Sequence, residues 1–130
     1  MLSAEQIINY QASNDCLKDR IIFITGAGDG IGKAAALACA QAGATVILAG
    51  RTVAKLEQVY DQISDAGLAE PNIYPINLEG AIADDYDTLA VNLEQQFGRL
   101  DGLLHNAGIL GQRTPLSHYR QDVWDKVLQV

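Results

Sequence analysis

The stretch Thr25-Gly26-Ala27-Gly28-Asp29-Gly30-Ile31-Gly32 decides the fold of this 130-residue chain. It follows the apolar run Ile21-Ile22-Phe23-Ile24 and leads into an alanine-rich segment, residues 33–42. A strand, a glycine-rich turn and a helix in this order are what a dinucleotide phosphate site requires. Gly26 permits the sharp turn, Gly30 can adopt backbone angles that a Cβ forbids, and Gly32 lets the helix approach the strand. The pattern predicts that free N–H groups of the first helical turn face a pyrophosphate, with a glycine turn that binds nothing as the alternative.

Strands and helices alternate along the rest of the chain. Buried strands are expected at residues 21–25, 44–49, 73–76 and 100–104, and helices at 33–42, 53–63, 86–97 and 123–128. Alternating units of this kind build a parallel sheet with right-handed crossovers. The predicted fold class is therefore α/β, a Rossmann-type parallel sheet with helices on both faces and strand order 3-2-1-4, incomplete at its C-terminal side. Pro75 agrees with a third strand at the sheet edge, since proline lacks the N–H that a ladder needs.

Apolar spacing predicts which face each helix buries. The first helix is expected to bury the small residues that recur every three or four positions, namely Ile31, Ala34, Ala35, Ala38 and Ala42. For the next three helices the expected apolar positions are Val53, Leu56, Tyr60 and Ile63, then Tyr86, Leu89, Leu93 and Phe97, then Val123, Trp124, Val127 and Leu128. Gly43, Gly67 and Gly98 are expected to end the helices that precede them.

Charge and composition exclude several classes of partner. The net charge of −7 argues against nucleic acid or an anionic membrane as a partner. The first twenty residues lack a continuous apolar stretch, so no signal peptide is expected, and no run approaches the roughly 20 apolar residues of a membrane span. Cys16 and Cys39 show no metal-ligand spacing and suit a reducing compartment. We therefore expect a cytoplasmic protein without a metal site.

A second motif, His105-Asn106-Ala107-Gly108, stands where the fourth strand ends. With the T-G-x-x-x-G-x-G pattern of the glycine loop, it resembles the short-chain dehydrogenase/reductase family, and within it a group of bacterial oxidoreductases. The resemblance runs from Leu17 to Val130 and implies that the second motif stabilises the central sheet and lines the nicotinamide ribose. His105 replaces the usual first asparagine and is interpreted as a hydrogen-bonded histidine at a strand end rather than a proton-transfer group.

The end of the second strand bears on the choice of cofactor. A carboxylate there would chelate the ribose hydroxyls of NAD and repel the 2′-phosphate of NADP, but this chain has Gly50 followed by Arg51. Glycine leaves room and a guanidinium binds phosphate bidentately, which favours NADP(H) over NAD. Asp29 argues the other way, because some NADP-preferring relatives carry a basic residue in that part of the loop. A solvated Arg51 is the alternative interpretation.

The resemblance also implies an adenine contact after the third strand. The family commonly has an aspartate there, and Asn77 takes its place as an acceptor or as a simple turn residue. The residues expected to bind the dinucleotide are Gly26, Gly28, Asp29, Gly30, Ile31, Gly32, Arg51, Asn77, Leu78, Asn106, Ala107 and Gly108.

Proton-transfer residues of the family are not found in this sequence. The family uses a serine and a Y-x-x-x-K pair, and none of the five tyrosines here has a lysine four positions on; Tyr119, for example, is followed by Val123. We therefore expect residues 1–130 to be the N-terminal part of a single dinucleotide-binding domain. The resemblance implies hydride transfer between the nicotinamide and a small-molecule carbonyl or alcohol, and a homo-oligomer once the fold is complete. A non-catalytic dinucleotide-binding module or redox sensor is the alternative.

Overall fold

Four parallel strands form the centre of the protein. The computed structural model describes residues 1–130. Its strands are β1 (Ile21–Thr25), β2 (Thr45–Gly50), β3 (Asn72–Pro75) and β4 (Gly102–Leu104), all parallel and in the order β3-β2-β1-β4. This confirms the predicted strand order and places Pro75 in an edge strand, where its missing N–H costs no ladder bond. The strands lie within two residues of their expected bounds.

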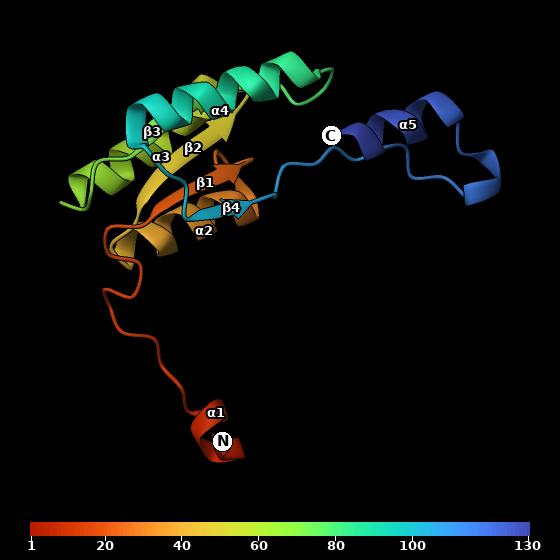
Figure 1. Ribbon diagram of the computed structural model, residues 1–130. Coiled ribbons are helices and arrows are strands. Elements are labelled where there is room, and N and C mark those ends of the chain that lie inside the picture. Colours follow the sequence, from red (N-terminus) through yellow and green to blue (C-terminus); the bar gives the residue numbers. More distant parts are fainter.

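Helices connect these strands, and two short helical segments were not expected from the sequence. The elements are α1 (Ala4–Ile8), α2 (Gly30–Gln41), α3 (Val53–Asp65), α4 (Ala83–Phe97), the 3₁₀ turn η1 (Leu116–His118) and α5 (Gln121–Gln129). Figure 1 shows α1 away from the sheet, at the end of an extended segment, and α5 beyond one end of the sheet. No helix of the structure combines the length and apolarity that a membrane crossing needs.

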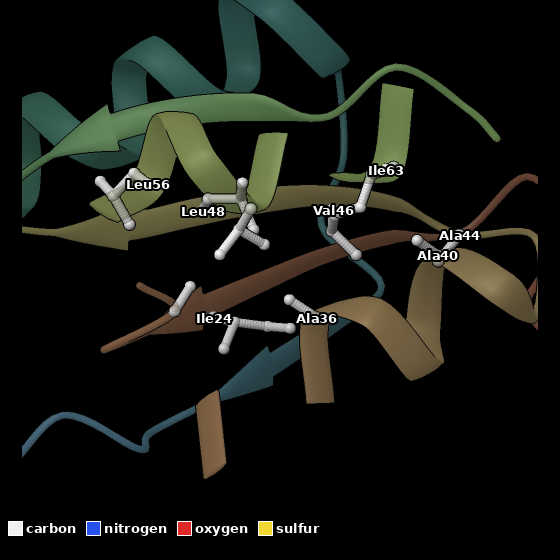
Figure 2. Packing of buried hydrophobic residues seen from close by; sticks show 10 residues of the cluster. Ile24, Ala36, Ala40, Ala44, Val46, Leu48, Leu56 and Ile63 are labelled. Carbon is white, nitrogen blue, oxygen red and sulfur yellow. The ribbon is translucent and has the colours of Figure 1, made fainter. Parts of the chain in front are cut away.

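Apolar side chains from alternate strand positions build a core on each face of the sheet. On one face, Ile24, Val46 and Leu48 pack against α2 and α3 (Figure 2). On the other, Phe23 and Ile47 pack against α4. Figure 1 accordingly shows α2 and α4 on opposite sides of the sheet. Helices therefore cover both faces, as expected for a parallel sheet.

The buried face of α2 differs from the predicted one. Its buried residues are Gly32, Ala36 and Ala40, whereas Ile31, Ala34 and Ala38 are exposed. A helix made almost wholly of small residues has no unique apolar stripe, so its orientation is decided by the row that allows the closest approach to the sheet. That row begins with Gly32, the one residue in it that has no side chain.

Several other expected core positions lie at the surface. Val53 and Tyr86 are 40% and 44% exposed, while Val59, which was not predicted, is fully buried on α3. In β4, Leu103 is 50% exposed and Leu104 is 37% exposed. The outer edge of β4 has no neighbouring strand in this structure, which matches the expectation of a sheet that is incomplete on this side.

Asp101 fastens the beginning of β4 to the beginning of β1. Its carboxylate accepts a hydrogen bond from the Ile21 N–H at 2.8 Å and from Arg99 Nε at 3.0 Å, and Arg20 lies 3.4 Å away. These donors lower the pKa of the Asp101 carboxyl, the Ile21 N–H most of all and then Arg99. The folded state therefore stabilises the ionised form of Asp101 relative to its protonated form.

We expect an Asp101→Asn variant to melt several degrees below the parent at neutral pH, because the amide cannot form these ion pairs. A depressed pKa contributes stability above the pKa of the unfolded carboxyl, about 3.9, and this stability is lost as pH falls through the lower folded value. The difference in melting temperature, followed by circular dichroism from pH 7 to 3, should shrink below about pH 4. A difference that stays constant over this range would contradict the assignment.

Candidate functional site

The carboxyl ends of the strands surround a cavity of about 710 Å³. Its walls come from the glycine loop, the ends of β2 and β3, and the segment after β4; they are Thr25, Gly26, Asp29, Gly30, Ile31, Ala49, Gly50, Arg51, Ile76, Asn77, Leu78, Glu79, Asn106, Ala107, Gly108, Ile109, Leu110 and Val130. From β1 the chain adds β2 and β3 on one side of the sheet and then β4 on the other side. The cavity lies at this change of direction, which is where open α/β sheets bind ligands. A cavity of this size suits a cofactor.

Close backbone contact at the glycine loop requires two of its glycines. Gly26 has a φ of +66°, and a Cβ on it would lie 2.8 Å from Asn106 Nδ2. A Cβ on Gly32 would lie 2.1 Å from the Gly26 carbonyl oxygen. The loop, the first turn of α2 and Asn106 therefore fit together only where these side chains are absent.

Thr25 joins the two sequence motifs. It is 5% exposed, and its hydroxyl accepts hydrogen bonds from the N–H groups of Asn106 and Ala107, both at 3.0 Å. The Asn106 amide in turn donates to the carbonyl oxygens of Thr25 and Gly26, at 3.1 and 3.3 Å. Asn106 thus fixes the glycine loop against the end of β4, and Ala107 and Gly108 are placed on the cavity wall.

Free hydrogen-bond donors remain at the N-terminus of α2. The Asp29 carboxylate accepts from the Gly30 N–H at 2.8 Å, and the Asp29 carbonyl accepts from the Lys33 N–H. The N–H groups of Ile31 and Gly32 have no acceptor within the chain. Gly30, with a φ of +53° and open space where its Cβ would be, faces the cavity beside them. This arrangement can bind an anion such as a pyrophosphate.

A smaller cavity of about 200 Å³ adjoins the first, beside Arg51. It is lined by the loop, the end of β2 and the first turn of α3, namely Gly26, Gly28, Asp29, Gly50, Arg51, Thr52, Lys55 and Leu56. Lys55 Nζ lies 2.7 Å from Asp29 Oδ2. That hydrogen bond, followed by the one from Gly30, lowers the pKa of the Asp29 carboxyl. Lys55 was not predicted, and it neutralises the carboxylate that argued against NADP.

Glu79 provides a second carboxylate at the other side of Arg51. Its Oε2 lies 3.5 Å from Arg51 Nη1, and its other oxygen forms an ion pair with Lys126 of α5. Lys126 is the main cause of the lowered pKa of the Glu79 carboxyl. Asn77 Oδ1 accepts from the Glu79 N–H at 3.1 Å, so Asn77 shapes this turn and also lines the large cavity.

The structure brings most of the predicted site residues together. Ten of them line the large cavity; Gly28 lines only the smaller one, and Gly32 lines neither because it is packed against Gly26. Sequence reasoning missed Lys55, Glu79, Ile109, Leu110 and Val130 on these walls. No group of three or more His, Cys, Asp or Glu side chains is placed to hold a metal ion.

His105 lies apart from this cleft. It lines an apolar cavity of about 370 Å³ on the α4 side of the sheet, together with Phe23, Leu89, Leu93 and Leu103. No hydrogen bond is present for its ring, because the side chain faces this apolar cavity, so the expected hydrogen-bonded histidine at a strand end is not found. The structure thus gives it no base or nucleophile partner.

Known proteins are similar to this chain in sequence and in fold. A family model for short chain dehydrogenases matches residues 20–130. The oxidoreductase YciK of Escherichia coli K12 is 43% identical over 123 residues, which cover 95% of this chain and 49% of YciK. A solved structure from Pseudomonas syringae is 50% identical, with a TM-score of 0.88 over 93% of this chain and 50% of that one.

A structure from Escherichia coli CFT073, complexed with NADPH, is 44% identical, with a TM-score of 0.86 over 92% of this chain and 50% of that one. The chain thus spans about half the length of the relatives it matches. The family model covers most of its residues, and the solved relatives share its fold. This protein belongs to the short chain dehydrogenase family.

Proposed function

We propose that this protein is an NADP(H)-dependent oxidoreductase and that residues 1–130 supply its cofactor-binding half. The observation that carries the proposal is the end of β2, where Gly50 and Arg51, instead of a carboxylate, border the cleft beneath the glycine loop. A relative of similar fold that was crystallised with NADPH supports it. When bound, the cofactor supplies hydride exchange with a carbonyl or alcohol carbon.

The residues present fit this cofactor. The N–H group of Ile31, on the cavity wall, is free to bind a pyrophosphate, and the open space at Gly30 lets the phosphates approach the backbone. Arg51 binds the 2′-phosphate of the ribose, and Asn77 and Leu78 border the adenine. Ala107 and Gly108 line the nicotinamide ribose side, held there by Asn106.

Two features concern the whole protein. We propose a single dinucleotide-binding domain of which residues 1–130 are the N-terminal part, acting in the cytoplasm as a homo-oligomer on a small carbonyl or alcohol substrate. Apolar side chains of β4 and α5 are exposed, such as Leu103, Trp124 and Leu128. Their exposure supports the proposal that this part of the fold packs against further protein. Cys16 and Cys39, which are not bonded to each other, are compatible with a reducing compartment.

A non-catalytic dinucleotide-binding module is the second candidate. It would use the same cleft, and it requires no tyrosine with a lysine four positions later, a pair that residues 1–130 do not contain. A serine and a Y-x-x-x-K pair in sequence that follows Val130 would support the enzyme, and their absence there would support the module. Turnover of NADPH with a panel of ketones and aldehydes, using protein of the relatives' length, separates the two experimentally.

Cofactor preference tests the proposed function directly. In protein of the relatives' length, NADPH should bind more tightly than NADH, and Arg51→Ala should weaken NADPH by about tenfold to a hundredfold, since it removes a charge-assisted contact. Gly50→Asp should shift the preference toward NADH by like-charge repulsion. A Cβ there would lie 3.3 Å from Leu56 Cδ2, a tight contact that requires the Leu56 side chain to move by a few tenths of an ångström, so the melting temperature of this variant is measured beside its affinities. Equal affinities of the parent for both cofactors, measured by fluorescence titration, would contradict the proposal.

A further inference from the structure

The cavity beside Arg51 contains two cations, and each of them is paired with a carboxylate. Arg51 lies near Glu79, and Lys55 is hydrogen-bonded to Asp29. The Arg51 and Lys55 side chains are 62% and 52% exposed, so both can reach a ligand in the cavity without a change of the backbone. Each carboxylate thus serves as the counterion of one cation beside this cavity.

Lys55 reaches this position because Gly28 leaves room for it. A Cβ on Gly28 would lie 2.9 Å from Lys55 Cβ, so the first turn of α3 packs directly on the glycine loop. The ammonium group is thereby held beside the loop at Asp29, at the mouth of the cavity that Arg51 borders from the strand side. The loop itself contributes a carboxylate and no cation, and Lys55 supplies a positive charge to it from the neighbouring helix.

We propose that Lys55 is the second cation for the 2′-phosphate and that Asp29 sets cofactor discrimination through its ion pair with Lys55. The inference rests on the proposed binding of NADP(H). A phosphate monoester carries between one and a half and two negative charges at neutral pH, which one guanidinium alone does not balance. With phosphate bound between Arg51 and Lys55, the ammonium is shared between the phosphate and Asp29. Asp29 therefore lowers the affinity that Lys55 would otherwise provide.

Substitution of Lys55 and Asp29, singly and together, tests this inference in protein of the relatives' length. Lys55→Met should weaken NADPH binding by about tenfold and change NADH binding by less than about twofold. Asp29→Asn keeps an acceptor for the Gly30 N–H and removes only the charge, so it should tighten NADPH binding by a few fold. In the Lys55→Met background the same Asp29→Asn change should give no gain, because Asp29 acts through Lys55.

A matched control removes the same charge elsewhere. Lys18 lies just before β1, at the opposite end of the sheet, and lines neither of the two cavities, so Lys18→Met should leave both affinities unchanged. Adenosine 2′,5′-bisphosphate carries the 2′-phosphate and adenosine 5′-monophosphate lacks it. Lys55→Met should therefore weaken binding of the bisphosphate and leave binding of the monophosphate nearly unchanged.

Different outcomes separate this inference from the proposed function. If the parent binds neither dinucleotide, the proposed function and the inference both fail. If the parent prefers NADPH and Lys55→Met keeps that preference, only the role of Lys55 is wrong. If Asp29→Asn tightens NADPH equally with and without Lys55, Asp29 acts as a general repulsive charge, and the ion pair does not set the discrimination.

Discussion

An alanine at position 32 should lower the melting temperature of the protein by roughly 10 °C or prevent folding, although it adds a single methyl group. The new Cβ would lie 2.1 Å from the Gly26 carbonyl oxygen and 2.5 Å from Asn106 Nδ2. Backbone atoms cannot move aside as the end of a flexible side chain can, so α2 must shift. That shift would separate Ala36 and Ala40 from the core, at a cost of about 3 kcal/mol or more.

Gly108→Ala is the matched control for this change. Gly108 lines the large cavity, and a Cβ on it meets no atom within 4 Å. Thermal unfolding followed by circular dichroism should therefore show a near-parental transition for Gly108→Ala and a strongly lowered one for Gly32→Ala. Equal melting temperatures for the two variants would show that α2 does not depend on the contact at Gly32.

A valine at position 30 should abolish dinucleotide binding and leave most of the fold intact. No atom lies within 4 Å of the place where its Cβ would be, so the branched side chain enters the open cavity in front of the free N–H groups of α2. Loss of these contacts to the pyrophosphate should weaken NADPH binding by more than about a hundredfold. Fluorescence titration measures the effect.

Backbone strain needs its own control, because Gly30 has a φ of +53°. Gly67 has a φ of +71°, also with open space around it, and it lies at the end of α3, outside both cavities of the site. Gly67→Val should lower stability to a similar extent and leave NADPH affinity at the parental value. Parental affinity in Gly30→Val would mean that the loop is not the phosphate site.

The sheet could be predicted from the sequence because each strand is a short apolar run bounded by turn residues. The strand order was taken from the Rossmann fold, which alternating strands and helices indicate, and Pro75 agrees with the edge position of β3. The buried face of α2 could not be predicted from its alanine-rich sequence. Its possible faces are similarly apolar, and they differ only in how closely each lets the helix approach β1. Helix α1 was missed because it is five residues long and contacts no core.

The parts of the candidate site that are formed by the backbone could be predicted from the sequence. The glycine loop and the segment from Asn106 to Gly108 are local patterns, and both lie on the cavity wall. Lys55 and Glu79 carry no local pattern. Lys55 enters the site because α3 packs on Gly28, and Glu79 enters it because the turn after β3 places it near Arg51. Such pairs depend on contacts between elements that are distant in sequence.

The larger of the two core clusters has a consequence for the order of folding during synthesis. All ten of its buried residues lie between Ile24 and Ile63, and the residues packed around them extend only from Leu17 to Ile73. The cluster joins β1 and β2, which pair after a single intervening helix, whereas β4 must join β1 across most of the chain. Short loops close at lower entropic cost. A nascent chain can therefore bury this face of the sheet while α4 and β4 are still within the ribosome, and β4 joins an edge that is already formed.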